Sequence, residues 1–399
     1  MCGIVGYSGP KEPLPILING LSRLEYRGYD SAGIAISDGN KITIEKKEGK
    51  LDVLKDHLKN NQMSGNVGIG HTRWATHGVP NDVNAHPHSD NNEEFAIIHN
   101  GIIENYAEIK KDLLNEGFEF KSDTDTEVVA VELSRKWSGE LLKTVVDVAS
   151  SLEGTYALLV TTTKEEGTIV AGRLMSPLVL GVGDDEVFLA SDSAAILEHT
   201  KKMIFLENGD FVEIKNGKYK LFDSDLNEIE REIQEIDWEV SEAEKSGYDH
   251  FMYKEILEQS EVIERTISGR LETNSDDIPI KSEHASKFEK IWIVACGTAY
   301  HAGLFGKDLF EKVLGVPVSV ELASEFRYRE PIVGKNDLGI VISQSGETMD
   351  TIAATELLKE NGSHVLALVN VVGSSLARMA DSVFYLHVGP EIGVASTKA

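Results

Sequence analysis

Two different arrangements of strand-like and helix-like segments divide this sequence, and they restrict its fold more than any other feature. Up to about residue 222, short apolar stretches typical of strands follow one another, with helical patterns grouped beside them. This grouping predicts an α+β layered domain built on antiparallel sheets. From about residue 288, short apolar strands alternate with helical stretches, which predicts an α/β domain with a doubly wound parallel sheet.

Apolar periodicity and turn residues predict the individual elements. In the first part, helices are expected at 51–60, 105–116, 126–137 and 141–152, and strands at 67–71, 95–99, 155–162, 168–173, 178–183, 186–190, 203–206, 210–214 and 218–222. Asp38-Gly39-Asn40 predicts a hairpin between two further strands. In the second part, strands are expected at 291–295, 318–322, 338–343, 364–370 and 382–387, with helices at 301–314 and 349–361.

A stretch between the two parts differs in composition from both. Within residues 223–247 there are ten acidic residues against Arg231 and Lys245, with few strongly apolar side chains, which is typical of a solvated linker. The prediction is therefore a first domain at 1–222, an acidic linker at 223–250 and a second domain at 251–399. The second domain is expected to begin with a helix that carries on one face Ile256, Ile263, Ile267 and Leu271.

The sequence is strongly acidic, which restricts its partners. It has 66 Asp and Glu residues against 39 Lys and Arg residues, so its net charge is −27. Such a surface repels phosphate backbones and anionic lipids, so neither nucleic acid nor a membrane is an expected partner. No apolar run approaches the roughly 18–20 residues that cross a bilayer, and the N-terminus lacks the pattern of a signal peptide. With two cysteines, the sequence predicts a cytoplasmic protein without a disulfide framework.

Cys2 follows the initiator methionine and is a candidate nucleophile. If Met1 is removed, residue 2 carries both a thiol and an α-amine, whose ordinary pKa of roughly 7.7–8.0 suits a general base near neutral pH. The alternative is that a cysteine at this position has no role.

Residues 70–78 place several binding groups in a loop after a strand. Arg73 carries a planar guanidinium suited to a carboxylate, and Trp74 follows it. A surface salt bridge for Arg73 and core packing for Trp74 are the alternatives. His71 and His77 suggest a metal, but carboxylates and cysteines at ligand spacing are missing nearby, so no metal is expected.

Two further groups follow strand 95–98. Asn100 and Gly101 could direct a side-chain amide and a backbone N–H at a developing oxyanion, although an ordinary Asn-Gly turn is the alternative. Residues 122–127 begin a helix, so one of them caps it, and a second acid there could bind an ammonium group.

Together these groups resemble the glutaminase domain of class II glutamine amidotransferases, which are N-terminal-nucleophile hydrolases. The motifs that carry the resemblance are residues 2–6, 24–33, 71–78, 84–87 and 99–101. The resemblance implies a four-layer αββα fold, in which Cys2 attacks the side-chain amide of L-glutamine and Asn100 and Gly101 form the oxyanion hole. It also implies that Trp74 gates the passage of ammonia and that glutamine is held by Arg73, Thr76, His77 and Asp125.

Two strand-to-helix turns in the second part are candidate anion sites. Residues 291–303 and 338–348 each run from a strand through small or hydroxyl-bearing residues into a helix, which places N–H groups and hydroxyls at a helix N-terminus. Ordinary capping by Ser and Thr is the alternative. Neither turn has the lysine of a P-loop or a Gly-x-Gly-x-x-Gly run, so nucleotide binding is not expected.

With residues 325–329 and 391–399, these turns resemble the first sugar-isomerase (SIS) domain of the glutamine–fructose-6-phosphate aminotransferases. The resemblance implies that fructose 6-phosphate is bound by Thr298, Ser343, Gln344, Ser345 and Thr348, with the site completed by Val394 and Ser396. Ala299 stands where the family often has a serine. Because the family continues into a second sugar-isomerase domain, the chain is expected to be truncated at its C-terminus and to act as a glutaminase. The full-length protein is expected to be a homodimer without a cofactor that makes glucosamine 6-phosphate and glutamate.

Two other functions remain open on the sequence alone. A class II amidotransferase with another acceptor, such as phosphoribosyl diphosphate, would need an acid-rich phosphoribosyl-binding loop after a strand, and the sequence shows none. A non-catalytic sugar-phosphate-binding regulator is the second alternative, and the intact motifs around Cys2 argue against it.

Overall fold

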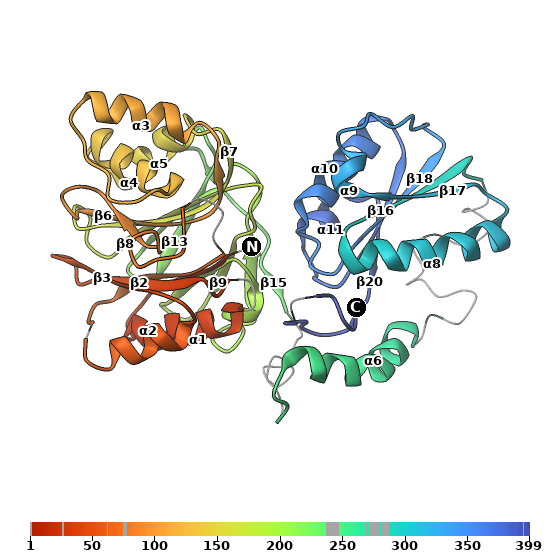
Figure 1. Cartoon of the computed structure of the whole chain (residues 1–399), viewed down its shortest axis with the longest axis horizontal. Helices are drawn as coiled ribbons and strands as arrows, with labels where there is room; N and C mark the ends of the chain where they lie inside the picture. Colours follow the sequence, from red (N-terminus) through yellow and green to blue (C-terminus); the bar gives the residue numbers. More distant parts are fainter. Residues whose placement is uncertain are drawn as a thin grey trace. The chain divides into compact units, whose positions relative to one another are not determined.

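The computed structural model describes residues 2–25, 28–61, 63–74, 78–236, 247–268, 270, 280, 287–393 and 395–399. The chain divides into two compact units, residues 1–237 and 238–399 (Figure 1).

Among the described residues of the first unit, two antiparallel sheets pack face to face between two layers of helices (Figure 1). The first sheet has the strand order β15 (Gln234–Glu235), β11 (Lys202–Phe205), β9 (Val179–Val182), β10 (Val187–Ala190), β1 (Gly3–Ser8), β4 (Val67–Arg73), β2 (Ser31–Ser37) and β3 (Ile42–Glu48). The second has the order β14 (Glu228–Ile229), β13 (Lys218–Phe222), β12 (Phe211–Lys215), β8 (Thr168–Leu174), β7 (Gly154–Thr162), β6 (Phe95–Ile103) and β5 (His88–Ser89).

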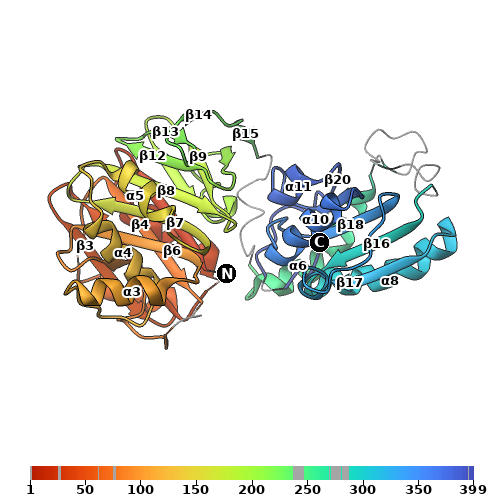
Figure 2. The same ribbon diagram turned by 90° about the horizontal axis from the view of Figure 1, so that it is seen from above.

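Apolar side chains from the facing sheets form the core between them. Ile4 and Ile69 of the first sheet pack with Ala96 and Leu159 of the second, and all four are fully buried. α1 (Pro13–Leu24) packs on the outer face of the first sheet with α2 (Leu51–Leu58) beside it (Figure 1). α4 (Asp125–Arg135) and α5 (Leu141–Ala149) pack on the outer face of the second sheet, with α3 (Tyr106–Asn115) against α4 (Figure 2). The predicted αββα arrangement is therefore confirmed.

Two predicted local features are present beside these layers. The hairpin between β2 and β3 turns at Gly39, whose φ is +91°, and Asp38 Oδ1 accepts the N–H groups of Asn40 and Lys41 at 2.9 and 2.8 Å. α4 begins after Thr124, whose side chain accepts the Glu127 N–H at 3.3 Å as an N-cap. Both turn chemistries come from short polar side chains that bind neighbouring backbone groups.

Residues 223–236, which were predicted to be linker, instead belong to the first unit. β14 pairs with β13, and β15 pairs with β11. Ile236 is buried, and Arg231 donates through Nε and Nη2 to the two carboxylate oxygens of Asp210 at 3.0 and 2.8 Å. The linker prediction is wrong for this stretch because a few apolar anchors, strand pairing and ion pairs such as Arg231–Asp210 outweigh its many exposed acids. Residues 237–246 lie outside the described part of the chain.

The second unit is a doubly wound α/β domain, as predicted. Its parallel sheet has the strand order β17 (Val318–Leu322), β16 (Lys290–Ala295), β18 (Asp337–Ser343), β19 (His364–Val369) and β20 (Ser382–Tyr385). α8 (Gly297–Leu314) lies on one face, and the other face carries α9 (Ala323–Phe326), α10 (Met349–Glu360) and α11 (Ser375–Met379) (Figure 1). The strand order reverses between β16 and β18, so the loops after these two strands lie at a switch point where ligands commonly bind.

α6 (Phe251–Ile267) opens the described part of the second unit and buries polar side chains. Lys254 and Glu255 are buried, whereas Ile256, Ile263 and Ile267, which were predicted to share one face with Leu271, are exposed. Leu271 lies outside the described residues. The reason is that the polar face of α6 contacts the segment around residues 391–398 through hydrogen bonds.

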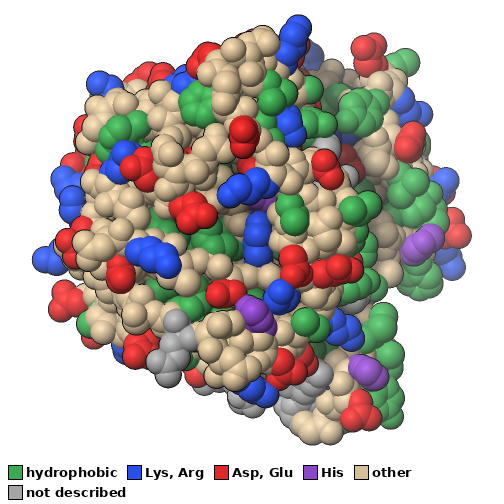
Figure 3. Space-filling view, turned by 60° about the vertical axis from the view of Figure 1, so that its left-hand side comes forward, with side chains coloured by type: hydrophobic (Ala, Val, Ile, Leu, Met, Phe, Trp, Pro, Cys, Tyr) green, Lys and Arg blue, Asp and Glu red, His purple; other side chains and the backbone are tan. Residues whose placement is uncertain are grey.

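The surface carries charges of both signs. On the face drawn in Figure 3, acidic and basic side chains are intermixed, so the net charge of −27 forms no single acidic field there. Within the part of the chain that the structure describes, no helix has the length and apolar character needed to cross a membrane.

Candidate active site

The candidate nucleophile Cys2 lies beside the end of β4. β1 and β4 pair in antiparallel register with Gly3 opposite Thr72, which brings Cys2 next to Arg73 and Trp74. The Trp74 N–H donates to Cys2 Sγ at 3.2 Å, and the thiol donates to the Trp74 carbonyl oxygen at 3.6 Å. The pairing of β1 with β4 therefore holds the Cys2 sulfur against the backbone of Trp74.

Asn100 reaches the same place from the other sheet. Its side-chain Nδ2 donates to the Cys2 carbonyl oxygen at 2.9 Å. The alternative of an Asn-Gly turn is wrong, because β6 continues to Ile103 within the ladder to β7. Gly101 has a φ of +135°, and an added Cβ would lie 2.0 Å from the Thr155 carbonyl oxygen. Only glycine therefore fits position 101 of β6 without a clash with the neighbouring strand.

Arg73 and Asp125 place opposite charges near Cys2. Asp125 is the first residue of α4 and is buried, and its Oδ2 accepts the Ile103 N–H at 2.9 Å. Arg73 is also buried, and burial lowers the pKa of its guanidinium, whereas the charges of Cys2, Asp125 and Asp30 raise it. A guanidinium and a carboxylate held at one site suit the two charged groups of an α-amino acid.

The environment of Cys2 keeps its thiol protonated. Burial raises the pKa of the thiol above its ordinary value, while the Trp74 N–H and Arg73 lower it. Since the thiolate is the nucleophilic form, the site needs a base to take this proton.

The remaining predicted residues of this site differ in how far the structure describes them. Trp74 is 44% exposed, and its ring meets the Tyr29 ring edge-on, with their centroids 5.4 Å apart. Thr76 and His77 lie outside the described residues.

A cluster of buried histidines beside Asn100 was not predicted. Its members are His71, His86, His88 and His99. The rings of His71 and His86 stack at 4.3 Å, and His86 meets His88 edge-on at 4.7 Å. Burial lowers the pKa of His86 and of His88 well below the ordinary value, so both rings are neutral. Across the described ranges, no group of three or more His, Cys, Asp or Glu side chains could hold a metal ion.

In the second unit, the predicted hydroxyls gather after β16 and β18. Thr298 lies in the first turn of α8, Ser343 ends β18, and residues 344–348 connect β18 to α10. Ser343 Oγ lies 2.9 Å from Thr348 Oγ1 and accepts the Gly346 N–H at 3.1 Å. Ser345 Oγ accepts the N–H of residue 347 at 3.2 Å. Two adjacent helix N-termini lined by hydroxyls form a site suited to an anion.

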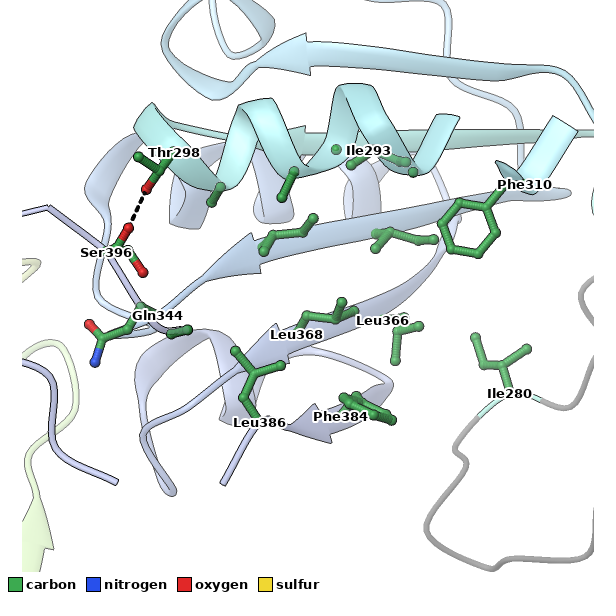
Figure 4. A pocket seen from close by; sticks show the side chains of 17 residues that line it. Ile280, Ile293, Thr298, Phe310, Gln344, Leu366, Leu368, Phe384, Leu386 and Ser396 are labelled. Atoms are coloured by element: carbon green, nitrogen blue, oxygen red, sulfur yellow. Dashed lines mark hydrogen bonds between the residues drawn. The ribbon is translucent and has the colours of Figure 1, made fainter. Parts of the chain in front are cut away.

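The segment 391–399 contacts these turns. Thr298 Oγ1 donates to the Ser396 carbonyl oxygen at 3.2 Å (Figure 4). The Glu391 carboxylate accepts the Ser396 hydroxyl at 2.8 Å and the N–H groups of residues 397, 398 and 399 at 2.7, 2.8 and 3.2 Å. Glu255 of α6 accepts the N–H groups of residues 392 and 393 at 2.7 and 2.8 Å. Neither glutamate was predicted, because a carboxylate that binds distant backbone groups leaves no local pattern in a sequence.

A pocket of about 440 Å³ adjoins these groups. Thr298, Gln344 and Ser396 lie at one end of it, and apolar side chains of β18, β19 and β20 line much of the rest (Figure 4). Val394 lies outside the described residues. Hydrogen-bonding groups for a polar ligand are therefore concentrated at the end next to the two helix N-termini.

The fold and the site define a class of protein. The first unit is a glutamine amidotransferase domain of the N-terminal-nucleophile type, and the second is a SIS domain. The glutamine amidotransferase domain family matches residues 56–246, and the SIS domain family matches residues 285–399.

Curated relatives identify the family within this class. Glutamine–fructose-6-phosphate aminotransferase (isomerizing) of Clostridium acetobutylicum is 50% identical over 403 residues, covering 100% of this chain and 66% of the relative. The protein of the same name from Bacteroides thetaiotaomicron is 47% identical over 409 residues, covering 100% of this chain and 67% of the relative. The chain belongs to the glutamine–fructose-6-phosphate aminotransferase family. It spans 66% of the length of the first of these relatives.

A solved structure shares the fold. Glutamine phosphoribosylpyrophosphate amidotransferase from B. subtilis, complexed with ADP and GMP, superposes with a TM-score of 0.52 and 19% identity, covering 96% of this chain and 90% of that chain. At this identity the similarity concerns the fold alone.

Proposed function

We propose that the first unit hydrolyses L-glutamine at Cys2 and that the second unit binds fructose 6-phosphate. The observation that carries the proposal is the convergence on Cys2 of a strand and a loop far apart in the sequence. The sulfur accepts the Trp74 N–H at 3.2 Å, and the Asn100 amide donates to the Cys2 carbonyl at 2.9 Å. In a protein as long as the relatives, the ammonia released would convert fructose 6-phosphate to glucosamine 6-phosphate.

The first chemical step is attack by sulfur on the side-chain amide carbon of glutamine. The raised pKa of the thiol means that a base must remove its proton. With Met1 removed, the α-amine of Cys2 is this base. The carbonyl oxygen becomes an oxyanion that accepts N–H groups of Asn100 and Gly101. Arg73 and Asp125, with Thr76 and His77, hold the α-carboxylate and α-amine of the substrate.

The second step breaks the carbon–nitrogen bond. The nitrogen takes a proton from the α-ammonium of Cys2 and leaves as ammonia, and a γ-glutamyl thioester remains on the sulfur. Water then adds to the thioester and releases glutamate and the free thiol. Trp74, which is partly exposed beside the sulfur, is positioned to gate the departure of ammonia.

The sugar phosphate would bind at the switch point of the second unit. Its phosphate accepts hydrogen bonds from the hydroxyls of Thr298, Ser343, Ser345 and Thr348, with Gln344, Val394 and Ser396 around the sugar. The N-termini of α8 and α10 add favourable partial charge. The family relationship further supports a homodimer of the full-length protein and a location in the cytoplasm.

Glutamate release from L-glutamine tests the first part of the proposal. The Cys2→Ala variant should lose activity to background, because no other thiol lies at the site. Cys296→Ala is the matched control, since Cys296 is the other free cysteine, precedes α8 and should leave the rate unchanged. Glutamate release by Cys2→Ala at the wild-type rate would refute the assignment and favour a regulatory protein.

Calorimetric titration of the chain with fructose 6-phosphate tests the second part. Ser343→Ala should weaken binding by about tenfold or more, since a hydrogen bond to a charged group contributes about 1.5–3 kcal/mol. Ser319→Ala, on β17, is the control for removing a serine outside the turns. The absence of saturable binding to a chain with an intact circular dichroism spectrum would contradict the sugar site.

A further inference from the structure

His71 contacts the predicted oxyanion-hole residue from behind. It lies on β4, is 1% exposed, and its Nε2 is 3.0 Å from Asn100 Oδ1 and 3.1 Å from the His99 carbonyl oxygen. A carbonyl oxygen can only accept, so Nε2 carries the hydrogen and donates to both. The hydrogen-bond network therefore assigns the Nε2–H tautomer to His71.

This donor decides which way the Asn100 amide faces. With Oδ1 accepting from His71, the NH₂ group points to Cys2, and one of its two hydrogens binds the Cys2 carbonyl oxygen at 2.9 Å. A rotation of the amide by half a turn would place Oδ1 against the Cys2 carbonyl and the NH₂ group against the His71 N–H. In that orientation the amide would present an acceptor instead of a donor to a developing oxyanion.

The His71 ring is itself held in place. It stacks on His86 with centroids 4.3 Å apart, and His86 Nε2 lies 2.9 Å from Thr126 Oγ1 on α4. Burial lowers the pKa of His71 to about 3, so the ring is neutral near physiological pH and donates through Nε2 alone. The orientation of the donor is thus fixed by packing and does not vary with pH in the working range.

We propose that His71 is a positioning residue for glutamine hydrolysis, which fixes the Asn100 amide with its NH₂ group toward the reacting carbonyl. This inference rests on the proposed glutaminase function of Cys2. His71 does not touch the substrate and acts through Asn100.

Steady-state kinetics of glutamine hydrolysis by the chain tests the proposal. Removal of one oxyanion donor costs about 100- to 1,000-fold in kcat, so His71→Leu should lower kcat by about 10- to 100-fold, with KM changed less than about threefold. His71→Gln, whose terminal amide can donate from nearly the position of Nε2, should recover most of the loss. In an Asn100→Ala background, His71→Leu should lower kcat by less than about threefold, because the group it orients is gone.

His88→Leu controls for the loss of a buried ring. His88 belongs to the same cluster but binds Thr124 Oγ1, at 3.0 Å, and not Asn100. Thermal melting of both leucine variants separates loss of folding from loss of rate, and His71→Gln keeps the test open if His71→Leu does not fold.

The proposal is overturned if His71→Leu and Asn100→Ala lower kcat by independent factors, or if His71→Gln, folded and stable, is as slow as Asn100→Ala. If Cys2→Ala remains active, the glutaminase function itself has failed. If Cys2→Ala is inactive while His71→Leu keeps the wild-type kcat, this inference alone has failed.

Discussion

Replacing Lys46 by methionine should change how the free energy of unfolding depends on pH. Lys46 lies on β3, and its ammonium group donates to the carbonyl oxygens of residues 83, 85 and 87 at 3.1, 2.7 and 3.1 Å. These carbonyls flank His86, which stacks on His71. Burial lowers the pKa of Lys46 from 10.5 to about 8, although the negative charge of Glu127 acts to raise it.

The sign and size of the effect follow from this pKa. Between pH 8 and 10.5 the unfolded chain keeps a proton on Lys46 that the folded chain has released, so stability rises with pH in this window. Below pH 8 both states are protonated, and the full cost of burying the charge is present. At about 1.36 kcal/mol per pKa unit the whole window corresponds to about 3 kcal/mol, and partial exposure to water reduces this to about 1–2 kcal/mol.

Urea denaturation at pH 7 and pH 10, followed by circular dichroism, measures this effect. From pH 7 to pH 10, the free energy of unfolding of the wild-type chain should rise by about 1–2 kcal/mol relative to that of Lys46→Met. Lys47→Met, at the next position of β3, removes an amine that pairs with Asp82 at 2.6 Å and should show no such shift. A difference between wild type and Lys46→Met that stays constant from pH 7 to pH 10 would refute the reasoning.

Three other substitutions have defined outcomes. Gly101→Ala places a Cβ 2.0 Å from a backbone oxygen at a φ of +135°, so β6 must shift and kcat for glutamine hydrolysis should fall by about 100-fold, as measured by glutamate release. Glu391→Ala removes the acceptor for one hydroxyl and three N–H groups of the 391–399 segment, and calorimetry should show fructose 6-phosphate binding weakened by about tenfold or more while glutamate release is unchanged. Asp337→Leu leaves the Trp292 indole N–H and the Gly334 N–H without their acceptor, each at 2.8 Å, and should lower the free energy of unfolding by about 2–4 kcal/mol in urea titrations.

The strands and helices were largely predictable because their apolar periods are strong and local. The stretch predicted as 155–162 forms β7 at Gly154–Thr162, and the helix predicted at 349–361 forms α10 at Met349–Glu360. The site residues could be named because unusual side chains cluster in short motifs. Their contacts could not be predicted, since Cys2 and Asn100 meet across 98 positions of sequence through the pairing and stacking of two sheets.

The features that the sequence did not reveal depend on partners far away along the chain. The acids of residues 223–236 suggest a linker, yet Arg231 binds Asp210 of the first unit, 21 positions earlier. The apolar side chains of α6 suggest a core-facing side, yet its buried Glu255 binds backbone N–H groups 137 and 138 positions later. The apolar pattern of a sequence shows where apolar side chains recur. It does not show which polar side chain will form hydrogen bonds with a backbone segment far away in the sequence.

The same distinction between local and long-range effects resolves the apparent conflict between a net charge of −27 and the proposed phosphate site. Exposed charges act on an approaching ligand through salt that screens them within about 8–10 Å, and they weaken binding most for large polyanions that lie along the surface. At the turns after β16 and β18, by contrast, hydroxyls such as those of Thr298 and Ser343 and the helix N-termini would act on a bound phosphate at hydrogen-bond distance. We therefore expect the net charge to disfavour large polyanions as partners, while a few oriented donors select the small anion of the proposed site.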